Sequence, residues 1–432
     1  MKWSLPMTRP QTAILHYTAP PIVGGVEVVI KAHAREFVKA GYPVTVIAGR
    51  GERKALPPGV GFIRIPEIDS RYGEVAEVSA ELEQGEIPAA FHALVNRLIE
   101  SLGAHLGQFD NVIVHNVFTK HFNLPLTAAL HYLLDAGEIR RCIAWCHDFS
   151  WASPSSRSKV HPGYPWDLLR EHRSDVTYVA VSQRRRRTLA TLFGCPLKQI
   201  RVVYNGVDPR GLLGLSAEGY TLIERLGLLE SDLVLLMPVR VTRAKNIEFA
   251  LEVVAALKAH SYRAELVVTG PPDPHDAESI AYLRSLQDLR RQLGVEQEMR
   301  FVFEAGPNPD QPYTIDARVV ADLYRISDVV FLPSRREGFG MPVLEAALVG
   351  SLIVCTAVPA AEEIGGADVI QFSLEETPGQ VAERILVWAE RSRRHRLRRR
   401  VRQDYTWRAI FQRDIQPLLH SEMSDAVYAG MD

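Results

Sequence analysis

Short apolar runs alternate along the whole chain with longer stretches in which apolar residues recur every three or four positions. This alternation is typical of parallel strands between layers of helices, because a strand covered on both faces needs apolar residues throughout. The pattern therefore predicts an α/β fold. In the first half we expect strands at Thr12 to His16, Val44 to Ala48, Asn111 to His115, Arg141 to Cys146, Val176 to Val181 and Ile200 to Val203. Helices are expected between them, at Glu27 to Ala40, Ile87 to Leu106, Leu124 to Ala136 and Arg184 to Phe193.

A second series of strands begins after Asn205-Gly206-Val207-Asp208. These strands are expected at Leu233 to Val239, Ala264 to Thr269, Arg300 to Phe303, Val329 to Leu332 and Leu352 to Val354. The segment Asp208 to Gly219 is rich in Gly and Leu without a clear period, so it is interpreted as a connector. We therefore expect one domain at residues 1–207, a second at 208–403, and a last helix within 404–432 that crosses back to the first domain.

Length and composition favour an ordinary globular protein of two domains. A chain of 432 residues exceeds what one core normally supports, and two domains imply a cleft between them. Hydrophobic residues make up 47% and charged residues 23%, with a formal net charge of -1, so no polyanionic partner such as a nucleic acid is indicated. No signal peptide or membrane-spanning stretch is recognised, so a cytoplasmic protein is expected, and peripheral membrane contact stays open.

The stretch most suggestive of chemistry follows the expected strand at Val329 to Leu332. It contains Glu337, a Gly338-Phe339-Gly340 turn, and a helix that Pro342 can start because a first-turn residue needs no amide donor. Glu345 is expected within the first turn of that helix. Ligands bind open α/β sheets beyond the carboxyl ends of the strands, so these carboxylates could hold a sugar hydroxyl and a ribose diol. The plainer alternative is that Glu337 solvates a loop and Glu345 complements the helix dipole.

A basic pair follows the expected strand at Leu233 to Val239. Arg240 and Lys245 lie in the loop before an amphipathic helix, where both side chains can face one diphosphate. Fixed cations there would stabilise the charge that develops on a leaving nucleoside diphosphate. Taken alone, two basic residues in a loop are more often solvated surface.

The nine residues from Glu337 to Glu345 resemble the E-x7-E signature of retaining glycosyltransferases of family 4, which have the GT-B fold of two Rossmann-like, doubly wound domains facing a cleft. Arg240 to Lys245 is similar to the R-x4-K element of that family. The resemblance implies that Glu337 contacts the donor sugar, Glu345 the ribose, and the basic pair the diphosphate. It also implies donor contacts from Gly338, Phe339 and Gly340, and a UDP-, GDP- or ADP-linked sugar as donor with no separate cofactor.

Two first-domain segments resemble the same family. Gly24 and Gly25 lie between the first strand and the first helix, where members carry a glycine loop beside the acceptor and the donor diphosphate. His147-Asp148-Phe149-Ser150-Trp151 resembles the active-site histidine region of members that act on small sugars. The resemblance implies that His147 hydrogen-bonds the transferred sugar and need not be a general base, since the donor phosphate takes the acceptor's proton. Taken alone, a Gly-Gly pair is often a tight turn, and an isolated histidine is usually structural.

Acceptor recognition is expected in loops of the first domain. The candidate acceptor-binding residues are Asp148, Lys120, Arg157 and Tyr164, with His121, Lys159, His161 and Trp166 nearby. Cationic and aromatic groups of this kind suit a phosphorylated or carboxylated sugar, with rings stacking on the sugar faces. The same residues could equally be solvated surface.

No Asp-x-Asp motif follows an apolar strand, so no metal is expected, and Arg240 with Lys245 would take the place of a divalent cation. Two arginine runs, Arg184 to Arg187 and Arg391 to Arg402, are interpreted as solvated helix faces, although such runs can also recruit anionic lipid.

The predicted function is transfer of a hexose, glucose or mannose, to a small sugar, a sugar phosphate or a sugar acid. The alternatives are a lipid-linked or polysaccharide-precursor acceptor at a membrane surface, a nucleotide-sugar epimerase, and a catalytically silent nucleotide-sugar binding protein.

Overall fold

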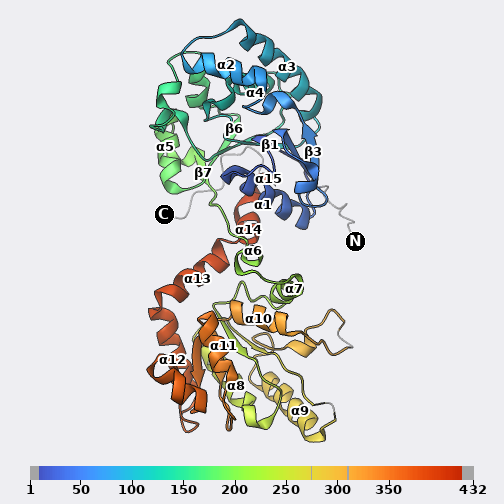
Figure 1. Cartoon of the computed structure of the whole chain (residues 1–432), viewed down its shortest axis with the longest axis vertical. Helices are drawn as coiled ribbons and strands as arrows, with labels where there is room; N and C mark the ends of the chain where they lie inside the picture. The colour runs from blue at the N-terminus through green and yellow to red at the C-terminus, as the bar shows by residue number, and fades with distance from the viewer. Residues whose placement is uncertain (1–8, 274, 309–310, 421–432) are drawn as a thin grey trace, which may run out of the picture. The chain divides into compact units, whose positions relative to one another are not determined.

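The computed structural model of the chain describes residues 9–273, 275–308 and 311–420. These residues form two compact units, one made of residues 9–206 and 407–420 and the other of the described residues between 207 and 406 (Figure 1). We refer to them as the first and the second unit. Each contains one sheet with helices around it, and neighbouring strands pair in parallel. The predicted α/β fold with two Rossmann-like, doubly wound domains is thereby confirmed.

The first unit has a sheet of seven strands. They are β1 (Thr12–Thr18), β2 (Val44–Arg50), β3 (Gly61–Arg64), β4 (Asn111–His115), β5 (Cys142–Cys146), β6 (Val176–Ala180) and β7 (Ile200–Val202). Their order in the sheet is β3-β2-β1-β4-β5-β6-β7, so β1 and β4 are neighbours although they are far apart in the sequence. The direction of winding reverses between these two strands. Such a switch point leaves room for a ligand at the carboxyl ends of the strands.

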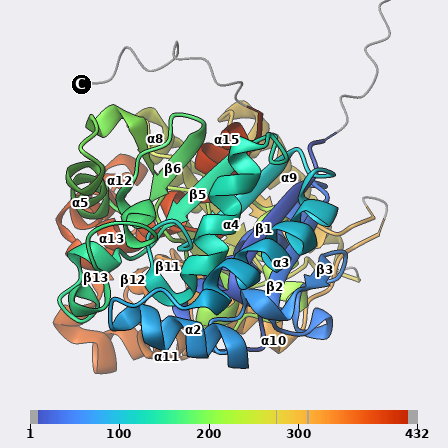
Figure 2. The same ribbon diagram turned by 90° about the horizontal axis from the view of Figure 1, so that it is seen from above.

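Helices cover both faces of this sheet, as parallel strands require. They are α1 (Gly25–Lys39), α2 (Gly73–Glu83), α3 (Ala89–Leu106), α4 (Leu124–Asp135), α5 (Gln183–Phe193), α14 (Trp407–Ile410) and α15 (Gln416–His420). Helices α2 to α5 contribute to the core on one face, and α2, α3 and α4 run in front of the strands in Figure 2. On the other face α1 packs against the C-terminal segment, where the rings of Phe37 and Phe411 have centroids 5.2 Å apart. The segment Trp407 to His420 therefore completes the core of the first unit although it follows the second unit in the sequence.

The second unit has a sheet of six strands. They are β8 (Leu233–Met237), β9 (Ala264–Val268), β10 (Met299–Phe301), β11 (Val329–Leu332), β12 (Leu352–Cys355) and β13 (Ile370–Gln371). Their order is β10-β9-β8-β11-β12-β13, which places a second switch point between β8 and β11, where Leu235 pairs with Val329. Every strand expected from the sequence is observed in the two sheets, with ends within two residues of those predicted.

The helices of the second unit are α6 (Pro209–Leu213), α7 (Ala217–Arg225), α8 (Ile247–Ala259), α9 (Ala277–Gln292), α10 (Ala317–Ile326), α11 (Met341–Val349), α12 (Pro378–Arg391) and α13 (Arg393–Asp404). Helix α8 packs beside α12, and α7 packs beside α10. Short helices in the loops of both units are η1 (Arg53–Ala55), η2 (Pro66–Ile68), η3 (His121–Asn123), η4 (Ser150–Ala152), η5 (Arg157–Lys159), η6 (Trp166–Arg170), η7 (Leu197–Gln199), η8 (Arg243–Lys245), η9 (Val302–Glu304), η10 (Ala361–Gly365), η11 (Gly366–Asp368) and η12 (Phe411–Ile415).

The interpretation of Asp208 to Gly219 as a connector is wrong, because this segment contains α6 and the start of α7. Ser216 caps α7 by accepting a hydrogen bond from the amide of Gly219, and its own hydroxyl donates to Asp322 at 2.6 Å. A Cβ at Gly219 would lie 2.1 Å from a carboxylate oxygen of Asp322. Gly219 is thus needed for a close approach inside a helix and does not mark a loop.

Candidate functional site

The two loops at the switch point of the second unit are joined by an ion pair. Lys245, at the end of η8 after β8, donates from Nζ to Oε2 of Glu337, in the loop after β11. The hydroxyl of Ser334 donates to the same oxygen at 3.4 Å. Both charged side chains are only 20% exposed. Glu337 is therefore not a freely solvated loop carboxylate, and two of the predicted site residues are in direct contact.

Backbone and side-chain bonds fix these loops to each other. The amide of Arg335 donates to the carbonyl oxygen of Ala244 at 2.8 Å, and its guanidinium donates to Oδ1 of Asn246 at 2.9 Å. Asn246 is buried and left-handed, with φ of 52°, at the residue that precedes α8. Asparagine tolerates this conformation better than most residues. Neither Arg335 nor Asn246 was predicted from the sequence as a site residue. The one signal available for Asn246 was an asparagine directly before α8.

Arg240 lies in the same loop as Lys245 but is not paired. Its side chain is exposed and makes no hydrogen bond or ion pair with the described part of the chain. The loop after β9 packs directly on the backbone of Arg240, since a Cβ at Gly270 would lie 2.8 Å from Cα of Arg240. Arg243 instead places its guanidinium 5.0 Å from the ring centroid of Tyr282. Arg240 is therefore held at its backbone, with its charge available to a ligand.

The Gly-Phe-Gly turn leads from this loop into α11. Gly340 has φ of 98° and precedes the helix, a conformation that favours glycine. Phe339 is 39% exposed, Gly338 is exposed, and the carbonyl oxygen of Phe339 accepts from the amide of Ala360 at 2.9 Å. The turn is thus anchored through its backbone and open to solvent at its side chains.

Glu345 is placed differently from the prediction. Helix α11 begins at Met341, so Pro342 is its second residue, and the first turn carries no acidic side chain. The prediction of Glu345 in the first turn is therefore wrong. Its Oε2 accepts a hydrogen bond from the hydroxyl of Tyr324, a buried residue of α10. Burial, with the carboxylate of Glu345 beside it, raises the pKa of Tyr324, so the hydroxyl remains a donor.

The glycine pair of the first unit lies where β1 leads into α1. Gly24 precedes the helix without a side-chain cap, and Gly25 is its first residue. The first amides of a helix lack partners within it and can bind an anion. Glu27 is 8% exposed, and its carboxylate accepts from the Thr18 hydroxyl. A Cβ at Gly24 would lie 2.2 Å from Oε2 of Glu27, so the glycine makes room for that carboxylate.

His147 follows β5 and is 8% exposed. Its Nε2 lies 3.0 Å from Nδ1 of His115, at the end of β4, and the planes of the two rings are 21° apart. Burial, with smaller effects of His16 and Arg185, lowers the pKa of His147 to about 3. His147 is therefore neutral near pH 7.

Asn116 holds the backbone at His147, a role that sequence reasoning missed. Its Oδ1 accepts from the amides of His147 and Asp148 at 2.8 and 3.2 Å. Its own amide donates to the carbonyl oxygen of Trp145 at 2.9 Å, and its φ of 63° is left-handed. The ends of β4 and β5 are thus locked together at the predicted site.

Lys120 and Asp148 lie near each other in the loops after β4 and β5. Lys120 is 8% exposed, and its ammonium donates to the Ser156 hydroxyl at 3.4 Å. Burial lowers the pKa of Lys120, and the nearby charge of Asp148 opposes this effect. Asp148 is exposed and accepts from Arg185 at 2.7 Å. The side chain of Arg185 is still 42% exposed, so this ion pair lies on the surface, in keeping with the solvated face expected for Arg184 to Arg187.

Two guanidinium groups lie against one indole ring in the same region. Arg157 and Arg170 are 4.6 and 4.0 Å from the ring centroid of Trp151, which is itself nearly buried. The Trp151 indole N–H donates to the carbonyl oxygen of Trp166 at 3.0 Å. Tyr164 is 50% exposed and packs on Phe91. Arg157 is therefore held against an aromatic ring and is not simply solvated.

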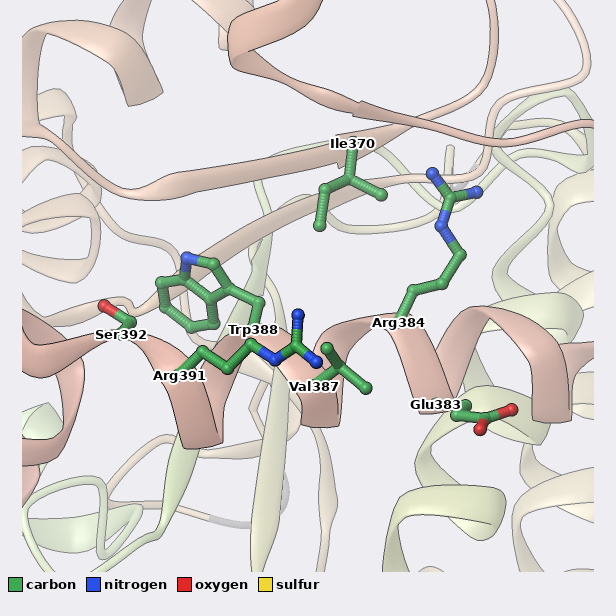
Figure 3. Close-up of a pocket in the computed structure, with 7 residues that line it drawn as sticks. All are labelled: Ile370, Glu383, Arg384, Val387, Trp388, Arg391 and Ser392. Atoms are coloured by element: carbon green, nitrogen blue, oxygen red, sulfur yellow. The ribbon is translucent and has the colours of Figure 1, made fainter.

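A separate hollow of about 780 Å³ lies between β13 and α12 of the second unit (Figure 3). It is lined by Ile370, Glu383, Arg384, Val387, Trp388, Arg391 and Ser392. It contains none of the predicted site residues, and we assign it no part in the reaction.

In the run from Arg391 to Arg402, the arginines on the inner side of α13 form ion pairs. Those on the other side, which we call the open side of α13, are exposed. Arg402 is 5% exposed and donates to Asp328 at 2.9 Å, and Arg399 pairs with Asp232 at 3.1 Å. The interpretation of this run as a solvated face is therefore wrong for the inner side of α13. The exposed arginines of α13 are Arg393, Arg394, Arg396 and Arg400.

Neither a metal cluster nor a membrane span is found in the described part of the chain. No group of three or more His, Cys, Asp or Glu side chains among those residues could hold a metal ion. No helix there combines the length and the apolar character needed to cross a bilayer.

Two family models match the chain, one in each unit. The model described as Glycosyltransferase Family 4 matches residues 23–210, and the model described as Glycosyl transferases group 1 matches residues 221–404. The matched residues include Gly24, His147, the loop from Arg240 to Lys245, and the segment from Glu337 to Glu345.

Individual relatives also extend over most of the chain. An uncharacterised glycosyltransferase of Methanocaldococcus jannaschii is 26% identical over 361 residues, which cover 82% of each chain. The mannosylglucosylglycerate synthase of Petrotoga mobilis is 23% identical over 71% of this chain and 69% of its own. A D-inositol 3-phosphate glycosyltransferase of Geodermatophilus obscurus is 29% identical over 78% of this chain and 70% of its own. With both units matched, the chain belongs to the family 4 glycosyltransferases.

Proposed function

We propose that this glycosyltransferase is a retaining enzyme that moves a hexose, glucose or mannose, from a nucleotide-sugar to an acceptor hydroxyl. The observation that carries the proposal is the ion pair of Lys245 with Glu337 at a switch point, with the exposed Arg240 in the same loop as Lys245. Lys245, a cation that can bind a diphosphate, thus lies beside a carboxylate that can accept from sugar hydroxyls, and Arg240 adds an exposed cation in the same loop. In this proposal the second unit binds the donor and the first unit binds the acceptor.

The proposed reaction breaks the bond from the sugar C1 to the diphosphate oxygen and forms a bond from C1 to the acceptor oxygen on the same face. The acceptor's proton passes to a phosphate oxygen of the leaving nucleoside diphosphate. Arg240 and Lys245 stabilise the negative charge that builds on this group, in place of a divalent cation. Glu337 accepts hydrogen bonds from the sugar and Glu345 from the ribose, while His147 hydrogen-bonds the transferred sugar.

We further propose a small sugar, a sugar phosphate or a sugar acid as acceptor. Lys120 and Arg157 support this, because a nearly buried ammonium and a guanidinium held against Trp151 suit an anionic group. The names of two relatives, an inositol 3-phosphate glycosyltransferase and a mannosylglucosylglycerate synthase, point to acceptors of this kind. The anion would be bound by the first unit.

A donor screen tests the proposed function. One of UDP-, GDP- and ADP-linked glucose and mannose is expected to raise the Tm most, because a ligand of the native state stabilises it by about 2.7 kcal/mol at 100 times its Kd. The same donor is expected to lose its sugar only when an acceptor is present. Conversion of the donor without an acceptor would indicate an epimerase, and binding without turnover would indicate a silent binding protein. Either result contradicts the proposal.

Removing the acceptor-side cations is expected to weaken acceptor saturation. Lys120→Ala and Arg157→Ala should each raise the acceptor KM by about tenfold, since a charge-assisted hydrogen bond contributes roughly 1.5–3 kcal/mol. The donor KM should stay near the wild-type value. Initial rates at varied acceptor concentration measure both constants, and Lys198→Ala and Arg187→Ala are matched exposed controls in the same unit. Unchanged acceptor kinetics in both test variants would remove the proposed anion site.

A lipid-linked or polysaccharide-precursor acceptor is the second candidate, and the open side of α13 favours it. Four exposed arginines surround Leu397, which is 60% exposed. Basic side chains bind anionic lipid headgroups, and an exposed leucine can enter the interface. Sedimentation with anionic but not with neutral vesicles is expected for this acceptor, with release at high salt. The quadruple change of the exposed arginines to glutamine should abolish the binding, and absence of vesicle binding in the wild type rejects this candidate.

A further inference from the structure

Four buried histidines of the first unit lie around its switch point. They are His16 on β1, His33 on α1, His115 at the end of β4, and His147 after β5, and each is at most 8% exposed. The ring of His33 packs against Trp145 and Trp407, with centroids 4.7 and 5.3 Å away. Only His147 has a role in the proposed reaction. The other three need a separate account, because buried polar rings are costly unless their hydrogen bonds are made.

The hydrogen bonds determine where some of the ring protons lie. Nδ1 of His16 is 3.0 Å from the carbonyl oxygen of His115, and a carbonyl only accepts, so His16 carries its proton on Nδ1. Nδ1 of His115 is 3.0 Å from Nε2 of His147, so one of these two nitrogens must donate. Nε2 of His115 is buried and has no hydrogen-bond partner among the described residues.

Two arrangements of the His115 and His147 protons are possible. Burial lowers the pKa of both rings, so each is neutral near pH 7 and carries one N–H. If His147 donates, His115 must carry its proton on the buried, unpaired Nε2. If His115 donates from Nδ1, its Nε2 has only an unpaired acceptor. An unpaired buried N–H is rarer in proteins than an under-used acceptor, which favours the second arrangement.

The two rings that are nearly parallel to that of His115 do not offset the cost of the first arrangement. The ring of His115 is nearly parallel to those of Trp145 and His147, at 29° and 21°. Its edge, which carries Nε2, therefore does not point at the face of either ring. An N–H there would have no aromatic acceptor in these two neighbours.

We propose that His115 is a positioning residue that donates from Nδ1 to Nε2 of His147 and so holds His147 in the tautomer with its proton on Nδ1. Asn116 fixes the backbone of the same residue by accepting its amide at 2.8 Å. His147 then presents an N–H to the ligand and cannot take a proton at that nitrogen. This inference rests on the proposed transferase role of His147, and it agrees with the proposed transfer of the acceptor's proton to the donor phosphate.

The tautomer can be measured without any turnover. Long-range proton–nitrogen correlation spectra of the full-length, ¹⁵N-labelled protein near pH 7 distinguish protonated from bare ring nitrogens. The signals of His147 are assigned by their loss in His147→Gln. We expect His147 to be protonated on Nδ1 and bare on Nε2 in the wild type. A proton on Nε2 overturns the inference, whether or not the protein proves to be a transferase.

Substitution of His115 tests the effect on the reaction. His115→Phe removes the donor and should lower kcat at least about tenfold with little change in the donor KM. His115→Asn should recover most of that loss, because the asparagine amide can donate from the place of Nδ1. His33→Phe is the control for packing, since His33 makes no hydrogen bond to His147, and its kcat should stay near the wild-type value.

The outcomes separate the inference from the proposed function. A folded His115→Phe variant with wild-type kcat overturns the positioning role, as does a folded His115→Asn variant as slow as His115→Phe. If His115→Phe fails to fold, the tautomer of the wild type still decides. If the wild type transfers no sugar from any nucleotide-sugar, the proposed function fails, while the spectra still report the tautomer.

Discussion

Glu337→Ala and Lys245→Ala are each expected to lower kcat by about two to three orders of magnitude, the loss typical of removing one preorganised charged or hydrogen-bonding group from a transition state. Glu337 would no longer hold the sugar, and Lys245 would no longer neutralise the leaving diphosphate. The change should appear mainly in kcat, because the charge on that group develops during the reaction. Release of nucleoside diphosphate at saturating donor and acceptor measures it. Near-normal turnover in either variant rejects the mechanism.

Two further variants separate catalysis from the integrity of the loops. Arg336→Ala, beside Glu337, removes an exposed charge with no partner in the described part of the chain, so its turnover should stay near that of the wild type. Each single variant leaves one member of a 20% exposed ion pair without its partner. If the pair only stabilised the loops, combining Lys245→Ala with Glu337→Ala would relieve that cost. We expect instead that the double variant is at least as slow as either single one.

Asp328→Asn is expected to lower the free energy of unfolding of the second unit by about 3–5 kcal/mol, the cost of leaving a buried charge without its counter-charge. Asp328 is 3% exposed and lies 2.9 Å from the guanidinium of Arg402 and 3.5 Å from that of Arg398. Its Oδ2 also accepts from the amide of Val234 at 3.0 Å. Urea unfolding measures the change, with Asp368→Asn as a control at an exposed carboxylate of the same unit. An equal effect of both substitutions would contradict this account.

The same carboxylate gives the second unit an acid-sensitive component of stability. Burial by itself would raise the pKa of Asp328, but Arg402, His395 and Arg398 outweigh it, and the pKa lies below the usual range. A group with a lowered pKa stabilises the native state above its unfolded pKa, about 3.9 for aspartate, and loses this contribution as the pH falls through the folded value. The difference in unfolding free energy between wild type and Asp328→Asn should therefore shrink as the pH falls below about 4. A difference that grows on acidification would contradict the assignment.

Elements buried on both faces could be predicted from the sequence with accurate bounds, whereas some partly exposed elements were missed. Strands β4 and β11 appear with the predicted bounds because their apolar runs are continuous and fully buried. Strand β3 was missed, since Gly61–Arg64 lies at the edge of its sheet and is not fully buried. Helix α2 was missed as well. It buries only Val75, Val78 and Leu82, which repeat at helical spacing within a segment otherwise rich in charge. Periodicity reports burial, so it weakens wherever burial is partial.

The candidate site was predictable where a short motif carries both position and chemistry. Lys245 and Glu337 came from separate motifs, and the structure joins them in one ion pair. Asn116 could not be found in this way, because its role depends on backbone amides from the neighbouring strand end. Tyr324, the partner of Glu345, could not be found for a similar reason, because it lies on another helix. Contacts between segments distant in sequence are not encoded in local pattern.

The return of the chain to the first unit also constrains the order of folding during synthesis. Ile410, Phe411, Ile415, Leu418 and Leu419 fill the core beneath α1, yet they are made after the whole second unit. Domains generally fold as units as they leave the ribosome, starting from the N-terminus. Here the first unit cannot close its core until the final turns emerge, so the second unit is expected to reach its native state first. A nascent chain paused before Trp407 would therefore expose the apolar face of α1 and depend on chaperones.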